Sequence, residues 1–303
     1  MGRQLGLGLL LALLAPACAA ASPDAASDDA ALEAGPRMLA LGDSISFGWD
    51  PLVQPDPALV NPASYEGFAE WLGAQKGWAV DNAACPGETS GSLVDVASPD
   101  NGCDQNRATY GLHTDWDSVA PRGTSFGTQR EFVDAYLRDA AARKRPPELV
   151  TVTIGGNDLL LLKRECHGPE SVPCLLQKLP EYTSRYQANV ETLVATIAAA
   201  GYTGDVVFVT TYAPDYSEQL EALGLTIFNG ALTDAIGQAQ AAHPTVRLRV
   251  ADGFAAFEAA ASAVGGKTCE TGLLIKKPDG TCDIHPSPRG DELLGAKVLA
   301  SLE

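Results

Sequence analysis

The sequence predicts an α/β domain in which helices cover both faces of a central, parallel, five-stranded sheet. Short apolar runs typical of buried strands alternate along the chain with longer segments of helical pattern. This alternation favours a parallel sheet, because a crossover connection is needed to return the chain between parallel strands. With 303 residues, 46% of them hydrophobic, the chain can bury a full core. We expect a single α/β/α domain over residues 36–303.

Five short apolar runs are the predicted strands. They are rich in Val, Leu and Ile, as suits strands buried on both faces. Their bounds are Met38–Leu41, Trp78–Asn82, Leu149–Ile154, Val206–Thr210 and Val246–Val250. In such sheets the catalytic loops lie beyond the carboxyl ends of the strands. The residues that follow each run are therefore the first place to look for chemistry.

Six segments with helical spacing alternate with these strands. They are Ser64–Gln75, Thr128–Arg143, Tyr182–Ala200, Tyr216–Ala242, Phe254–Ala263 and Pro288–Leu302. Three further stretches are long and contain cysteines, and we expect them to be irregular surface loops that shape a pocket. Their bounds are Asp95–Ser125, Lys163–Leu179 and Gly265–Ile284.

The N-terminal residues have the pattern of a secretory leader. Met1–Ala21 carries one early charge, Arg3, and then an apolar run too short to span a bilayer, followed by small residues. Residues 22–35 are small and acidic, as in a disordered spacer. We expect a secreted protein. The alternative is a lipoprotein anchored through Cys18, which ends a short lipoprotein-like box.

The formal net charge of −17 argues against binding to polyanions. Such a surface repels nucleic acid and anionic lipid headgroups. We therefore expect no nucleic-acid partner and no stable membrane insertion, and we expect the chain to act as a monomer.

Four short blocks carry the chemistry. Gly42-Asp43-Ser44 follows the first predicted strand, and a serine on such a turn can present its hydroxyl to a substrate. Asn82 to Thr89, which contains Gly87, follows the second strand. Gly155-Gly156-Asn157-Asp158 follows the third, and Asp283-Ile284-His285-Pro286 lies near the C-terminus.

These four blocks, in the order Ser, Gly, Asn, His, resemble those of the SGNH (GDSL-type) hydrolases. The resemblance extends from roughly residue 36 to the end of the chain. The resemblance implies a three-layer, flavodoxin-like α/β/α fold and an ester hydrolase that needs no cofactor. It implies Ser44 as nucleophile and His285 as general base. It also implies an oxyanion hole formed by the N–H groups of Ser44 and Gly87 and by the Asn157 side chain. These roles agree with the chemistry, because glycine permits close approach and asparagine offers a neutral donor.

The third member of a triad is left open by the sequence. Many family members have an aspartate three residues before the histidine, where this chain has Cys282, and Asp283 stands only two before. Either Asp283 orients His285, or a main-chain carbonyl near Cys282 does so, as in a Ser-His dyad branch of secreted esterases and lipases. The block around Gly87 and the presence of six cysteines after Cys18 resemble that branch.

Six cysteines besides Cys18 predict disulfide bonds in an exported chain. Fifteen connectivities are possible among six cysteines. Their spacing favours neighbouring pairs, namely Cys85 with Cys103, Cys166 with Cys174, and Cys269 with Cys282. A zinc site is the alternative, but the chain has neither Cys-x-x-Cys nor His-x-His spacing, so we expect no metal.

A second serine also sits in a nucleophile-like motif. Gly123-Thr124-Ser125-Phe126-Gly127 matches the Gly-x-Ser-x-Gly elbow, but the segment before it is polar and includes Pro121. That elbow requires a buried strand directly before the serine. We therefore expect Ser125 to be an ordinary loop residue.

The function predicted from these features is a secreted esterase or lipase that acts on a small-molecule or lipid ester through a Ser44 acyl-enzyme. Other reactions known on the same fold are deacetylation of polysaccharides and hydrolysis of phospholipids. A non-catalytic surface binding protein is a further alternative, because a fold by itself does not establish activity.

Overall fold

Five parallel strands form the central sheet of the computed structural model, which describes residues 35–53, 61–168 and 171–303. The strands are β1 (Arg37–Gly42), β2 (Ala79–Asn82), β3 (Leu149–Thr153), β4 (Asp205–Val209) and β5 (Arg247–Ala251). Their order in the sheet is β2-β1-β3-β4-β5. In the register, Met38 of β1 lies opposite Val80 on one side and Leu149 on the other. The predicted sheet is confirmed, with strand ends that differ by at most one residue.

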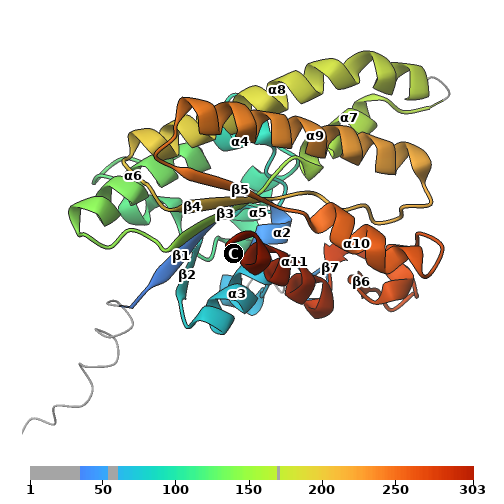
Figure 1. The fold of residues 1–303 in the computed structure, drawn as a ribbon, viewed down its shortest axis with the longest axis horizontal. Coiled ribbons are helices and arrows are strands. Elements are labelled where there is room, and N and C mark those ends of the chain that lie inside the picture. The colour runs from blue at the N-terminus through green and yellow to red at the C-terminus, as the bar shows by residue number, and fades with distance from the viewer. Residues whose placement is uncertain (1–34, 54–60, 169–170) are drawn as a thin grey trace, which may run out of the picture. The chain divides into compact units, whose positions relative to one another are not determined.

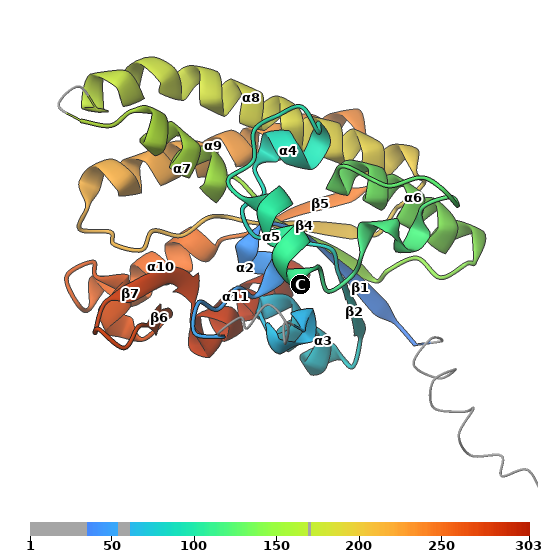
Figure 2. The same cartoon turned by 180° about the vertical axis from the view of Figure 1, so that it is seen from behind.

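Helices cover both faces of this sheet (Figures 1 and 2). One layer contains α4 (Ser90–Val94), α6 (Gln129–Ala142), α8 (Ser171–Ala199) and α9 (Gln219–Ala242). The other contains α3 (Phe68–Lys76), α10 (Gly253–Ser262) and α11 (Pro288–Ser301). The structure is therefore the expected three-layer α/β/α fold.

Alternating side chains of each strand separate the core into two clusters. On β1, Leu39 and Leu41 pack into the larger cluster, whereas Met38 and Ala40 pack into the smaller one on the opposite face. This is the period-two geometry of a strand, applied to a sheet without a solvent face. It explains why the predicted strands are continuous apolar runs.

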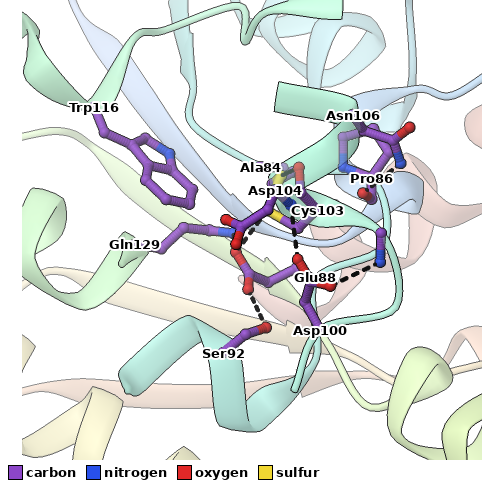
Figure 3. The surroundings of a disulfide bond; sticks show 12 residues. Ala84, Pro86, Glu88, Ser92, Asp100, Cys103, Asp104, Asn106, Trp116 and Gln129 are labelled. Carbon is purple, nitrogen blue, oxygen red and sulfur yellow. Dashed lines mark hydrogen bonds between the residues drawn. A yellow bond between two sulfur atoms is a disulfide. The ribbon is translucent and has the colours of Figure 1, made fainter. Parts of the chain in front are cut away.

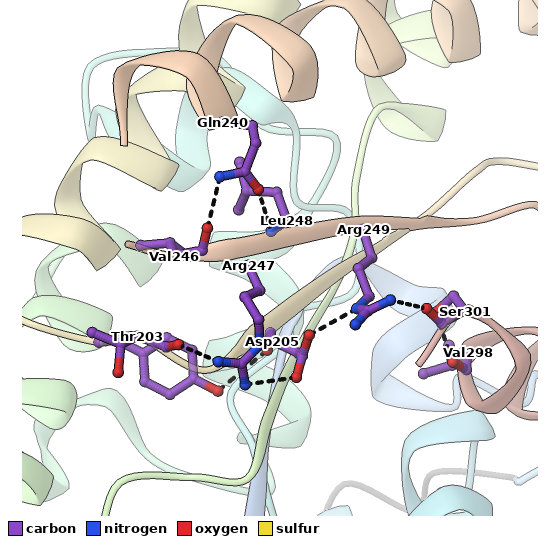
Figure 4. Close-up of polar contacts among 10 residues, drawn as sticks. Thr203, Asp205, Gln240, Val246, Arg247, Leu248, Arg249, Val298 and Ser301 are labelled. Carbon is purple, nitrogen blue, oxygen red and sulfur yellow. Dashed lines mark hydrogen bonds and ion pairs between the residues drawn. The ribbon is translucent and has the colours of Figure 1, made fainter. Parts of the chain in front are cut away.

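The edge of the sheet where the strands begin is held by polar side chains (Figure 4). The carboxylate of Asp205 accepts hydrogen bonds from Arg247 at 2.9 Å and from Arg249 at 2.7 Å. The Gln240 amide bridges the start of β5, because it donates to the carbonyl of Val246, just before the strand, and accepts from the N–H of Leu248, both at 2.9 Å. These contacts lie at the amino ends of the strands and leave the carboxyl ends free for a site.

The three stretches expected to be irregular contain regular structure, so that part of the prediction is wrong. Lys163–Leu179 includes the end of α7 (Gly156–Glu165) and the first turns of α8, which starts eleven residues before the predicted helix. The reason is that Leu175 and Leu179 pack against the core, so the helix continues past Pro180.

The other two stretches hold short elements. Asp95–Ser125 contains α5 (Cys103–Tyr110), and Gly265–Ile284 leads into an antiparallel hairpin of β6 (Leu274–Lys276) and β7 (Cys282–Pro286). Another short helix, α2 (Ser44–Phe47), follows β1 directly.

All three predicted disulfide pairs are present. Cys85 is bonded to Cys103, Cys166 to Cys174 and Cys269 to Cys282. The first ties the segment after β2 to α5, the second joins α7 to α8, and the third links the hairpin strand β7 to the turn before β6. Each bond therefore fixes a connection rather than the sheet.

No helix among the described residues is both long and apolar enough to cross a membrane. The predicted leader, the lipid-anchor alternative at Cys18 and all of the predicted spacer but Gly35 lie outside the described residues.

Candidate active site

Ser44 is the first residue of α2, at the carboxyl end of β1. Asp43 caps this helix, because its carboxylate accepts hydrogen bonds from Ile45 N–H at 3.0 Å and from the Thr153 hydroxyl at 2.9 Å. Gly42 has φ of +113°, and a Cβ there would lie 1.8 Å from the Thr153 carbonyl oxygen. The turn that presents Ser44 thus requires glycine at this position.

His285 and Asp283 reach Ser44 from the hairpin strand β7. The Nε2 atom of His285 lies 2.9 Å from the Ser44 hydroxyl oxygen. Its Nδ1 atom is hydrogen-bonded to the Asp283 carboxylate, which also accepts the backbone N–H of His285 at 3.2 Å. The hydrogen bond to His285 lowers the pKa of Asp283, so that this carboxyl stays ionised.

The two-residue spacing works because Asp283 and His285 lie on a strand. Residues i and i+2 of a strand project from the same face, so their side chains are neighbours. The partner of His285 Nδ1 in the structure is therefore the Asp283 carboxylate and not a main-chain carbonyl near Cys282.

Gly87 and Asn157 are joined through Asn101, a residue that the sequence did not single out. The Asn101 N–H donates to the Gly87 carbonyl at 2.8 Å, and the Asn101 side-chain amide donates to Asn157 Oδ1, also at 2.8 Å. Asn157 Nδ2 in turn donates to the carbonyl of Glu88 at 2.9 Å. These contacts leave the second hydrogen of Asn157 Nδ2 for another acceptor.

Gly87 occupies a conformation that suits glycine, with φ of +92°. A Cβ there would lie 2.7 Å from the Asn101 carbonyl oxygen and 2.8 Å from the Cys103 nitrogen. The Cys85–Cys103 disulfide holds these two segments together, and the Asn106 side chain donates to the Pro86 carbonyl at 2.8 Å (Figure 3). Only a residue without a side chain fits between them.

Behind this loop, Glu88 is buried against α6 (Figure 3). Its carboxyl group accepts a hydrogen bond from Gln129 Nε2 at 2.7 Å and one from the Ser92 hydroxyl. Burial raises the pKa of Glu88 to about 8, and the charges of Asp100 and Asp104 act in the same direction. Burial also raises the pKa of Asp43, beside Ser44, to about 7.

Cys85, Glu88 and Cys103 are the one group in the described part of the chain whose Cys, His or acidic ligand atoms lie close enough to hold a metal ion. Both sulfur atoms are bonded to each other. Because a metal-binding cysteine must be a thiolate, this donor set does not suit a metal.

Ser44 and Asn157 line a common hollow of about 80 Å³. Its walls are mainly apolar side chains from α2, α7, α9, β7 and the segment after β4, including Ile45, Leu160 and Ile284. A hydroxyl in contact with an imidazole thus faces a small apolar space, an arrangement that can take the acyl part of an ester.

Ser125, the second candidate serine, lies elsewhere. It is exposed, and its hydroxyl donates to the carboxylate of Asp117 at 2.7 Å. The prediction that it is an ordinary loop residue agrees with these contacts.

Comparison with known proteins gives the family. The model of the GDSL-like lipase/acylhydrolase family matches residues 40–293. No curated protein matches the chain.

Similar solved structures include a putative GDSL-like lipase from Parabacteroides merdae (12% identity, TM-score 0.49, covering 88% of this chain and 94% of the other). The acetylxylan esterase Axe2 from Geobacillus stearothermophilus has 15% identity and a TM-score of 0.47, and the match covers 88% of this chain and 94% of the other. A salicylyl-acyltransferase from a tetracycline biosynthetic pathway has 13% identity and a TM-score of 0.48. The match covers 88% of this chain, which spans only 54% of the length of the acyltransferase.

The family match covers most of the chain, including Ser44, Gly87, Asn157 and His285. The protein belongs to the GDSL-like lipase/acylhydrolase family.

Proposed function

We propose that this protein is a secreted carboxylic ester hydrolase that works through an acyl-enzyme on Ser44. The observation that carries the proposal is the continuous hydrogen-bonded chain from the Ser44 hydroxyl to His285 Nε2 and from His285 Nδ1 to Asp283. A nucleophile in contact with a base, which is itself oriented by a third group, is the arrangement that activates a hydroxyl.

In the acylation step His285 takes the proton of Ser44 as its oxygen attacks the ester carbonyl. The negative charge of the tetrahedral intermediate is stabilised by the N–H groups of Ser44 and Gly87 and by Asn157 Nδ2. His285 then gives the proton to the leaving alcohol, and the C–O bond of the ester breaks. Asp283 keeps Nδ1 protonated and stabilises the imidazolium that forms.

In the deacylation step a water molecule takes the place of the alcohol. His285 removes its proton as the water oxygen adds to the acyl carbonyl. When the intermediate collapses, the bond between the acyl carbon and Ser44 Oγ breaks, and His285 returns the proton to Ser44 Oγ as the acid is released. The same three donors stabilise the second intermediate, so no cofactor is needed for either half of the reaction.

Secretion is part of the proposal. Its support is the leader-like pattern of residues 1–21 together with three disulfide bonds, which persist in oxidising compartments. Expression of the full chain with and without residues 1–21, followed by fractionation of cells and medium, tests it.

Hydrolysis of p-nitrophenyl acetate tests the enzymatic proposal. We expect turnover by the wild type, loss of activity in Ser44→Ala, and retention of activity in Ser125→Ala, the matched serine control. Asp283→Ala should lower kcat by about 10²–10⁴-fold, as expected for a residue that orients the base and stabilises its protonated form. A wild type that hydrolyses neither this ester nor acetylated glycans or phospholipids would argue for a binding role.

A further inference from the structure

A second apolar hollow lies next to the one at Ser44. It has a volume of about 260 Å³ and is bounded by α7, the start of α8 and α9. Figures 1 and 2 both show these three helices side by side on the same layer of the molecule. Several of its walls are exposed leucines, with Leu176 60% and Leu223 52% accessible. Large apolar side chains gathered around one hollow point to an apolar ligand.

The two hollows share part of their walls. Leu159, Lys163 and Glu221 line both. Lys163 Nζ lies 2.8 Å from Glu221 Oε2, so an ion pair joins α7 to α9 where the hollows meet. Both partners are partly exposed, and such a pair is weak. The methylene stem of a lysine is itself apolar, so an aliphatic chain can lie against it.

We propose that the two hollows form one groove for the long acyl chain of the ester attacked at Ser44. The inference rests on the proposed function and names its substrate class as esters of long, unbranched fatty acids. The carbonyl carbon lies at Ser44, and the first methylenes fill the small hollow beside Ile45 and Ile284. The chain then passes Leu159, alongside the Lys163–Glu221 pair, and its end lies between the leucines of α8 and α9.

An acyl chain fits this groove better than a polar substrate does. The small hollow begins at the nucleophile, and the larger one adds mostly leucine side chains and only a few charged residues. An acetyl group would reach only the first hollow and would leave the second unused. Each methylene that enters an apolar site is expected to raise kcat/KM by up to about fourfold. The activity should therefore rise with chain length beyond the limit of the small hollow.

Gly224 offers a way to block the passage. It lies on α9 and lines the larger hollow, and a Cβ there would lie 3.6 Å from Leu159 Cδ1, which is an ordinary contact. A leucine at this position would project into the point where the hollows meet. Gly230 lies on the same helix, is exposed, and has open space around it, so Gly230→Leu is a matched control.

The experiment compares kcat/KM for p-nitrophenyl acetate and p-nitrophenyl dodecanoate in the wild type and both variants. We expect the dodecanoate-to-acetate ratio to fall by about tenfold or more in Gly224→Leu, as for a pocket that loses several methylene contacts, and to keep its wild-type value in Gly230→Leu. Equal ratios in all three folded proteins would overturn the inference while leaving ester hydrolysis at Ser44 in place.

Calorimetric binding of dodecanoate to Ser44→Ala, with and without Gly224→Leu, provides a readout that does not need turnover. Binding that is lost on adding Gly224→Leu supports the groove even if no ester is hydrolysed, in which case only the proposed function fails. Absence of dodecanoate binding together with an unchanged substrate ratio overturns the groove.

Discussion

The side chain of Gln129 holds both backbone groups of Gly42. Its Oε1 atom accepts the Gly42 N–H and its Nε2 atom donates to the Gly42 carbonyl, each at 2.7 Å. The same Nε2 atom donates to the Glu88 carboxyl group. One fully buried amide on α6 thereby connects the strand end that leads to Ser44 with the loop that contains Gly87. The proposed nucleophile and a proposed oxyanion donor are thus positioned by a common support.

Replacing Gln129 should impair both stability and catalysis. Gln129→Leu leaves the Gly42 N–H without an acceptor in a buried site, a loss that costs about 1–3 kcal/mol of unfolding free energy. Gln240→Leu removes the analogous bridge on β5, at the opposite edge of the sheet. Urea unfolding should show destabilisation in both variants, whereas kcat on p-nitrophenyl acetate should fall only in Gln129→Leu. An equal kcat in the two variants would contradict the supporting role.

Glu88 should make the protein less stable as the pH rises from about 5 to about 8. Its pKa is raised from an ordinary value of 4.5 to about 8, so the folded state holds a proton in this window that the unfolded state has lost. Stability then falls with pH by about 1.4 kcal/mol per unit for this one group. Glu88→Gln mimics the protonated acid and should remove that slope.

Unfolding free energies measured between pH 5 and 9 check this prediction. Wild type and Glu88→Gln should agree near pH 5 and diverge towards pH 8, with the variant more stable. Glu258→Gln, at an exposed position on α10, should follow the wild type at every pH. A difference between Glu88→Gln and wild type that does not change with pH would show that Glu88 is ionised throughout.

Asn101 should act as a positioning residue for the oxyanion hole. Asn101→Ala removes the hydrogen bond that fixes Asn157 Oδ1. We expect kcat to fall about tenfold with little change in KM, a smaller loss than the 10²–10³ expected when a donor itself is removed. The control is Asn61→Ala, which affects only a cap on an exposed turn. A change in KM with constant kcat would instead indicate substrate binding.

The Cys85–Cys103 disulfide should matter for activity as well as for stability. Its loop of 18 residues contributes up to about 3 kcal/mol in the chain-entropy model, and it holds the segment around Gly87 against α5. The double Cys→Ala variant should therefore lose stability and acetate hydrolysis together. Removal of the Cys166–Cys174 pair should lower stability while sparing acetate hydrolysis, because it joins α7 to α8 away from Ser44. Full hydrolysis of p-nitrophenyl acetate by a variant that lacks both disulfide bonds would refute the role of Cys85–Cys103 in activity.

Short-range patterns carried most of what could be predicted about the fold. Each buried strand is a continuous apolar run, so the order and type of the sheet elements follow from the sequence. The sequence places the start of α8 too late because the first turns of this helix are half-exposed. Their packing depends on α9, which is distant in sequence, and on α7, which is not among the predicted helices. Tertiary contacts of that kind leave no local pattern.

Long-range polar contacts explain which parts of the candidate site could not be predicted from the sequence. The contact between Asp283 and His285 depends on β7 being a strand, and the segment was expected to be a loop. Asn101 and Gln129 reach Gly87 and Gly42 from other elements, so neither has a motif of its own. The one available signal for Asn101 was its place inside the predicted Cys85–Cys103 loop.

Covalent labelling with a fluorophosphonate, read by intact mass and peptide mapping, reports directly whether Ser44 is an activated nucleophile. The reagent forms a stable adduct only with an activated serine. We expect one adduct per chain on Ser44, no adduct in Ser44→Ala, wild-type labelling in Ser125→Ala, and slow labelling in Asp283→Ala. Folded wild-type protein that takes up no label, or that carries it on Ser125, would contradict the assignment of Ser44, His285 and Asp283 as the catalytic group.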